Sequence, residues 1–237
     1  MQIEPLKAQS LENKAYLSIK EMIVSLNLSP NETINIKKLA DLLQVSITPV
    51  RAALQLLERE NLVCKVDNKG FYIAPLSIID VEYVYEMRRS LELLALERSI
   101  SNIDRGQLIS LITEIKKIFN YFNTDNQKLL SYNADYSLHD LIISSCANPY
   151  LQKTYYGLMS HIQRYRNLIR QSTLANNEEW IKSELKQHLQ IAEFILSGDL
   201  KSSQNAMYEH ITNLIEIVSS RLAQSGFPLK IKEEQKK

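Results

Sequence analysis

The chain has 237 residues, of which 45% are hydrophobic and 23% charged, a balance that fits one large or two ordinary globular domains and excludes a disordered chain. Five glycines and six prolines disfavour a β-sandwich and favour long helices. The formal net charge of +1 argues neither for nor against a polyanion partner, so evidence for a nucleic-acid site must come from local features. The pattern divides the chain into a domain of short elements over 1–75, a helical domain over 77–225 and a charged tail over 226–237.

The N-terminal domain is predicted to contain three helices followed by a hairpin. Apolar residues at helical spacing predict a first helix within 11–26, a second over 36–43, and a third that Ser46 can cap, with Pro49 in its first turn. The segments LVCKV and FYIAPL flank DNKG, where Gly70 can supply the positive φ of a turn. This order of elements is that of a winged helix-turn-helix.

The third helix has a polar face without apolar partners. Because its apolar stripe packs inward, Thr48, Arg51 and Gln55 point outward near the helix N-terminus, the part of a recognition helix that reaches base edges. Arg51 can pair with guanine through two hydrogen bonds, and Ser46 and Thr48 can bind phosphate. The alternative is an ordinary solvated face, since helix-turn-helix shapes also occur in proteins that bind no DNA.

The residues of this region carry a family resemblance. LADLLQVSITPVRAALQLLERENLV and the later GFYIAPL resemble the N-terminal domain of the GntR family of bacterial transcription regulators, over residues 12–76. The resemblance implies that Lys37, Thr48, Arg51 and Gly70 approach double-stranded DNA, with Gly70 at the tip of the wing.

Two positions depart from the family pattern. Ile47 stands where the family often has Arg, and Asn61 stands where it often has Gly. The first departure removes one expected contact to guanine or phosphate. We therefore expect an operator that differs from the family's common one, or a lower affinity.

The second domain is predicted to be an antiparallel bundle of helices. The signals that start and stop them include a capping-box sequence at Ser77, Asn148 followed by Pro149, and Gly198 followed by Asp199. Together with the apolar periodicity, these signals place six helices over 77–101, 104–123, 125–146, 148–172, 177–196 and 199–223.

Polar residues occur on the inward stripes of three of these helices. Asp135 and His139 share a face at i, i+4, while His188 and His210 lie on the apolar stripes of the fifth and sixth helices. Carboxylate and neutral imidazole suit a divalent transition metal such as zinc, nickel or manganese. A single inward histidine is more often a hydrogen-bonded core residue, and His161 also lies beside apolar residues. Spacing alone therefore leaves both interpretations open.

A second resemblance bears on these residues. DYSLHDLIISSCANPYL and HLQIAEFILSGDLKSSQNAMYEHI resemble the FCD effector domain of the FadR subfamily, over residues 77–222. The resemblance implies a structural or pocket-lining role for His161. It also implies a metal site, with zinc as the first candidate ion, formed by Asp135, His139, His188 and His210.

Arg88 is a charged residue on an otherwise apolar stripe. A guanidinium there needs an anionic partner, because burying it unpaired is costly. One interpretation is an internal ion pair with Glu92 or Glu97. The FCD resemblance instead implies that Arg88 pairs with a carboxylate of a small organic effector whose other end meets the metal. Arg89 is expected to face solvent.

The functional interpretation is a homodimeric transcription regulator that presents two recognition helices to a pseudo-palindromic operator, under the control of a small carboxylate effector. The chain has no N-terminal secretion signal, no run of roughly eighteen apolar residues, and two widely separated cysteines, Cys64 and Cys146. We therefore expect a cytoplasmic protein that does not cross a membrane.

Three alternatives remain from the sequence. The metal itself can be the signal, with the same ligands. A metal-dependent enzyme can use the same centre, but it lacks a clear general base and leaves the N-terminal domain unexplained. An architectural DNA-binding protein with a purely structural helical bundle is the third.

Overall fold

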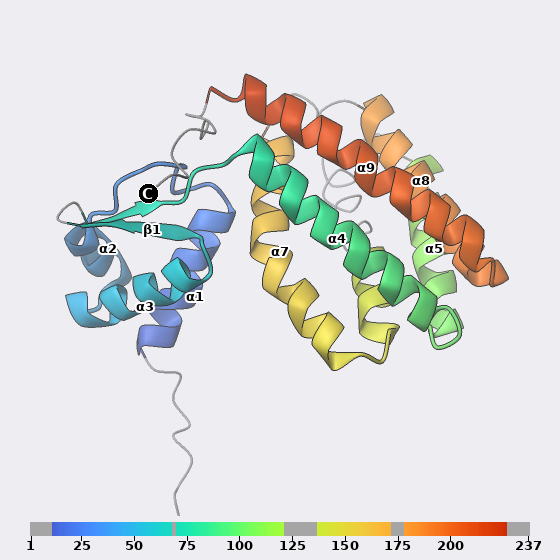
Figure 1. The fold of residues 1–237 in the computed structure, drawn as a ribbon, viewed down its shortest axis with the longest axis horizontal. Coiled ribbons are helices and arrows are strands. Elements are labelled where there is room, and N and C mark those ends of the chain that lie inside the picture. The colour runs from blue at the N-terminus through green and yellow to red at the C-terminus, as the bar shows by residue number, and fades with distance from the viewer. Residues whose placement is uncertain (1–10, 68–69, 121–136, 172–177, 227–237) are drawn as a thin grey trace, which may run out of the picture. The chain divides into compact units, whose positions relative to one another are not determined.

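The computed structural model describes residues 11–67, 70–120, 137–171 and 178–226 (Figure 1). Contacts between residues divide the chain into two compact units. One contains the elements before Ile78, and the other runs from Ile78 to Ser225. No helix in the described ranges has the length and apolar character needed to cross a membrane.

The first unit has the predicted winged helix-turn-helix order. The two strands pair antiparallel, with Val63 opposite Ile73 and Val66 opposite Gly70. Gly70 has the expected positive φ, 88°, a conformation that glycine adopts without steric cost. In chain order the elements are α1 (Leu11–Val24), α2 (Ile36–Leu43), α3 (Ile47–Arg59), β1 (Val63–Val66) and β2 (Gly70–Ile73).

One apolar core joins these elements. α1 packs against α3, as do α2 and β1, so α3 is the central element of the unit. Its inward stripe is fully buried, and truncating a leucine of this stripe to alanine would cost about 2–5 kcal/mol of stability. The stripe consists of Val50, Ala53, Leu54 and Leu57.

Ser46 corrects one expectation. It occupies the N-cap position of α3, with φ −73° and ψ 166°, but its side chain makes no capping hydrogen bond. An N-cap side chain accepts from the backbone N–H of the second or third helical residue. The third helical residue is Pro49, which has no N–H. The position of the cap was therefore predicted correctly, whereas the capping bond was not, and Ser46 is exposed at the helix N-terminus.

Asn61, which stands where the family often has glycine, has a left-handed backbone conformation. Its φ is 57°, in the left-handed region that asparagine tolerates better than most residues. Asparagine can therefore occupy this position in the connection from α3 to β1.

The second unit is helical throughout its described parts. The predicted helix over 125–146 begins outside the described residues, and its described part is helical over 137–145. α4 packs against α9 and α7, α5 packs against α8, and α8 packs against α9 (Figure 1). The remaining helices are α4 (Ile78–Ser99), α5 (Arg105–Asn120), α7 (Pro149–Arg170), α8 (Glu178–Ser197) and α9 (Leu200–Gln224).

The predicted helix ends in this unit have local causes. Asn148 accepts hydrogen bonds from the backbone N–H groups of Tyr150 and Leu151, and Pro149 opens α7. Asp199 accepts from the N–H of Ser202 at the start of α9. These caps fix where the helices begin, and thus which residues face the bundle interior.

Candidate metal centre and nucleic-acid interface

Three buried histidines meet inside the second unit. His139 comes from the helical stretch 137–145, His188 from α8 and His210 from α9, and each is at most 2% exposed. One ligand atom of each lies within 4.8 Å of those of the other two. Asp135, the fourth predicted ligand, lies outside the described residues. His161 is half-buried and does not belong to this cluster.

The spacing within the cluster suits a metal ion. Nε2 of His188 lies 3.2 Å from Nε2 of His210. Two nitrogens bound to one zinc at about 2.0–2.1 Å, at tetrahedral or smaller angles, lie about 3.0–3.4 Å apart. Without a metal, an N–H of one of these imidazoles can donate to the other. A bound ion would take the place of that proton.

Hydrogen-bond partners orient two of the rings. Nδ1 of His210 lies 2.9 Å from Oε1 of Gln187, an amide oxygen that only accepts. Nδ1 of His139 contacts the carboxylate of Glu92. Both Nδ1 atoms therefore carry the hydrogen, which leaves an Nε2 lone pair on each ring for a ligand.

Burial also sets the protonation state of the cluster. It lowers the pKa of His188 and His210 well below 6.5, and the neighbouring histidines add to the effect. Both imidazoles are therefore neutral at pH 7. This is the form that binds metal ions.

Glu92 joins the histidine cluster to Arg88. Its fully buried carboxylate accepts from Nε of Arg88 at 2.7 Å, from Oη of Tyr155 at 3.0 Å, and from Nδ1 of His139. Burial raises the pKa of Glu92, but the charge of Arg88 and the hydrogen bonds from Arg88 and His139 outweigh it and hold that pKa at about 2. Of the two ion-pair partners that the sequence left open for Arg88, the structure has Glu92, whereas Glu97 is exposed.

Arg88 keeps an unused donor despite this ion pair. The residue is 1% exposed, and among the described residues its Nη1 has no hydrogen-bond partner. The same holds for the hydroxyl of Tyr85, whose ring lies 5.6 Å from the Arg88 guanidinium. Burial lowers the pKa of Arg88 but Glu92 raises it further, so the guanidinium stays charged. A buried cation with a spare N–H can bind a carboxylate.

Two further buried titratable groups interact electrostatically with Arg88. Burial and the charge of Arg88 lower the pKa of Arg166 to about 10. Burial raises the pKa of Glu184 to about 7, against the charges of Arg166 and Arg88. The surroundings of Arg88 thus carry an excess of positive charge, which an anionic ligand would relieve.

Arg89 differs from its expected role as a solvated residue. Its Nη1 donates to Oγ1 of Thr212 at 3.0 Å, and its guanidinium lies 4.5 Å from the centre of the Tyr208 ring. Both partners are on α9, so Arg89 helps to hold α4 against α9 and does not point toward the histidines.

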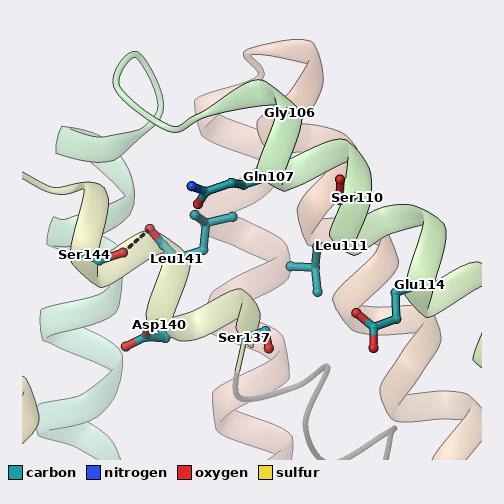
Figure 2. Close-up of a pocket in the computed structure, with 9 residues that line it drawn as sticks. All are labelled: Gly106, Gln107, Ser110, Leu111, Glu114, Ser137, Asp140, Leu141 and Ser144. Atoms are coloured by element: carbon teal, nitrogen blue, oxygen red, sulfur yellow. Dashed lines mark hydrogen bonds between the residues drawn. The ribbon is translucent and has the colours of Figure 1, made fainter.

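A separate pocket of about 580 Å³ lies between α5 and the helical stretch 137–145 (Figure 2). Its lining includes Gln107 and Glu114 of α5, with Ser137 and Asp140 of the other helix. Of the lining residues on that helix, Ser137, Leu141 and Ser144 lie on the side opposite His139 at helical spacing. The pocket is therefore distinct from the surroundings of the histidine cluster.

The predicted DNA-contacting residues lie on the surface of the first unit. Thr48, Arg51 and Gln55 are exposed on α3, on the side opposite its buried stripe. Lys37 is exposed on α2, and Gly70 is exposed at the start of β2. None of these side chains is needed for the apolar core.

Known proteins resemble the chain over most of its length. Residues 11–73 match the bacterial regulatory proteins of the gntR family, and residues 83–213 match the FCD domain. The HTH-type transcriptional regulator YdhC of Bacillus subtilis is 28% identical over 204 residues, which cover 84% of this chain and 86% of YdhC. The HTH-type transcriptional repressor GlaR of Escherichia coli is 21% identical over 220 residues, covering 88% and 96%.

Two solved structures support the fold. E. coli McbR/YncC superposes with a TM-score of 0.71 at 19% identity, covering 90% of this chain and 99% of that protein. A putative GntR transcriptional regulator from Rhodococcus sp. RHA1 superposes with a TM-score of 0.66 at 14% identity, covering 92% and 99%.

Proposed function

Because the chain belongs to the GntR family and carries an FCD domain, it is a DNA-binding transcription regulator and not an enzyme, and we propose that a small organic acid bound at a metal site controls its DNA binding. The observation that carries this proposal is the buried carboxylate of Glu92, which contacts both Arg88 and His139. It places a charged, incompletely hydrogen-bonded guanidinium next to a potential metal ligand.

The DNA-binding part of the proposal concerns the exposed side of α3. Arg51 pairs with a base edge, while Ser46 and Thr48 contact phosphate. Gln55 lies one helical turn after Arg51 on the same DNA-facing side. Lys37 neutralises a phosphate, and the wing at Gly70 approaches the minor groove. We place the protein in the cytoplasm, because that is where the DNA of a bacterium is.

The metal part of the proposal uses four ligands. His139, His188, His210 and Asp135 would hold a divalent ion, with zinc as the first candidate and nickel or manganese as alternatives. A bound metal would supply positive charge for one end of the acid. Glu92 and Gln187 keep two of the imidazoles in the tautomer that offers Nε2.

Arg88 provides the other end of the acid site. Its Nη1 donates to a carboxylate oxygen, while its Nε remains bound to Glu92. The hydroxyl of Tyr85, whose ring lies beside the Arg88 guanidinium, is a second donor without a partner among the described residues. The excess positive charge around Arg88 and Arg166 favours an anion. A small carboxylate fits this chemistry.

The homodimer is supported by an apolar strip on α4. Tyr83, Met87 and Leu94 lie on one side of the helix and are 59%, 47% and 45% exposed. A second copy of the chain would cover this strip. Two recognition helices would then face the two halves of a pseudo-palindromic operator. Met87→Lys should lower the mass measured by light scattering to that of a monomer.

The acid site can be tested by thermal unfolding. Zinc-loaded protein is screened with mono-, di- and tricarboxylates, and an acid that binds should raise Tm with increasing concentration. Arg88→Lys keeps a positive charge beside Glu92 but removes Nη1, so it should lose this shift. Arg89→Lys serves as the matched control, because Arg89 is the next residue but contacts α9, and this variant should keep the shift in Tm. A stabilising acid whose effect survives in Arg88→Lys would contradict the acid site.

The metal site has its own test. His188→Ala and His210→Ala should lose most of the bound zinc in elemental analysis, whereas His161→Ala should retain it. Equal zinc in all three variants would show that the cluster is not the metal site. If zinc alone changes operator affinity and no acid does, the ion is the signal.

A further inference from the structure

Ile47 is an exposed apolar side chain in the first turn of α3. Val50, Leu54 and Leu57 on the same helix are fully buried, whereas Ile47 is 43% exposed. α3 is described along its whole length, and Ile47 is its one exposed large hydrophobic residue. Single exposed hydrophobic residues are common on proteins, so its surroundings decide whether it has a role.

The position of Ile47 is on the DNA-contacting side of α3. Ile47 precedes Arg51 by one helical turn, which puts the two side chains on the same side of the helix. Thr48, which is also exposed, follows it directly. The first residues of a recognition helix reach the base edges of the major groove. A base edge is therefore the expected neighbour of Ile47 when DNA is bound.

The chemistry of isoleucine restricts what it can contact there. The side chain has no hydrogen-bond donor or acceptor, so it can bind neither phosphate nor the polar groups of base edges. The apolar group that the major groove displays is the 5-methyl group of thymine. Branching at Cβ restricts χ1, so little rotamer freedom is lost when this side chain makes a contact.

We propose that Ile47 contacts the 5-methyl group of a thymine in each half of the operator and makes thymine the preferred base at that position. The proposal rests on the proposed DNA-binding side of α3. An arginine at this position would favour guanine, with its two acceptors. Ile47 therefore changes the operator sequence that is recognised, in addition to removing a polar contact.

The test removes the methyl group from the DNA. Operators are first selected from a pool of random DNA duplexes with the full-length protein, and each thymine is then replaced in turn by deoxyuridine, which lacks only the methyl group. At one thymine in each half-site the replacement should weaken wild-type binding about fourfold, the change expected for one buried CH₂-sized group. Ile47→Ala should be insensitive to that replacement.

Two further variants complete the design. Leu17→Ala removes another exposed apolar side chain, on α1, and should keep the fourfold effect of the wild-type protein. Ile47→Arg, used in a new selection, should replace thymine by guanine at the same position. Because Ile47 is exposed, both variants at this position should fold, which circular dichroism checks.

The outcomes separate this proposal from DNA binding itself. If the deoxyuridine scan is the same for wild type and Ile47→Ala, or if Ile47→Arg selects the same thymine, Ile47 does not read the methyl group, while binding through α3 stands. If the wild-type protein selects no sequence, the DNA-binding side of α3 is wrong as well.

Discussion

At the scale of single residues, the buried carboxylate of Glu92 connects the parts of the proposed effector site. Taking an ionised carboxylate out of water costs several kcal/mol, and this cost is offset only where donors surround the charge. Glu92 has such donors from Arg88, His139 and Tyr155. A change that alters its charge should therefore affect the metal and the acid together.

Glu92→Gln tests this connection. The glutamine has a similar shape but turns an amide NH₂, which cannot accept, toward one of the three donors. We expect zinc affinity to fall about 10- to 100-fold, as for other changes to groups that orient a ligating histidine. Zinc competition with a chromogenic chelator measures it. Tyr155→Phe removes one hydrogen bond and keeps the charge, so its effect should be smaller. Unchanged zinc affinity in Glu92→Gln would show that the contact with His139 does not orient the ring.

The buried histidines predict how stability changes with pH in metal-free protein. Well above pH 6.5, His188 and His210 are neutral in both the folded and the unfolded chain and contribute no pH dependence. Below it, the unfolded chain takes up protons first, because burial keeps the folded-state pKa lower. The free energy of unfolding should thus fall by up to about 1.4 kcal/mol for each histidine and each pH unit.

Urea unfolding in the presence of a chelator measures this slope. The double variant His188→Gln with His210→Gln should lose most of it, since glutamine does not titrate, and the remainder comes from His139, whose pKa burial also lowers. His161→Gln should retain the full slope. An unaltered slope in the double variant would mean that other groups cause the acid sensitivity.

At the scale of elements, the sequence predicts what local chemistry determines. The starts of α7 and α9 follow from Asn148 and Asp199, whose side chains bond to backbone only two or three residues ahead. Ser46 is the N-cap as predicted but makes no capping bond: Pro49 removes one of the two N–H groups that could donate to it, and the other, of Thr48, is not bonded to its side chain. The contact between Glu92 and His139 joins residues 47 positions apart, and no periodicity within one helix reveals it. The sequence does place His139, His188 and His210 on the inward faces of their helices. The distances between the three imidazoles depend on how the helices pack, which the sequence does not give.

The polar side of α3 gives a prediction for the whole element. Arg51→Ala should weaken specific operator binding by about 1–3 kcal/mol, as expected for the loss of one bidentate base contact, and should leave the helical content unchanged. Lys37→Ala should instead lower the salt dependence of binding, with little effect on base preference, because it contacts phosphate. Fluorescence anisotropy at several salt concentrations distinguishes the two. Unchanged operator affinity in Arg51→Ala would contradict the proposed orientation of α3.

At the scale of the whole molecule, the proposed acid site and the proposed DNA-binding side lie in different compact units. Regulation then requires that the molecule has at least two conformations and that the acid and the operator each bind one of them more tightly. If both favour the same conformation, the acid strengthens DNA binding, and if they favour different ones, it weakens DNA binding. The acid can shift the equilibrium only by the difference between its affinities for these conformations. Neither ligand needs to contact the other.

Thermodynamic linkage turns this requirement into a last prediction. If a carboxylate found in the thermal screen changes operator affinity by some factor, saturating operator must change the affinity for that acid by the same factor. Acid titrations of zinc-loaded protein by calorimetry, with and without operator duplex, give the second factor, and anisotropy gives the first. Arg88→Lys should bind operator as the wild-type protein does without acid, because Arg88 lies outside the DNA-binding unit. Because this variant should not bind the acid, acid should leave its operator affinity unchanged, and operator should leave its acid affinity unchanged. An acid that changes operator affinity while operator leaves acid affinity unaltered would mean that the acid acts on the DNA or on a competing species and not through this site.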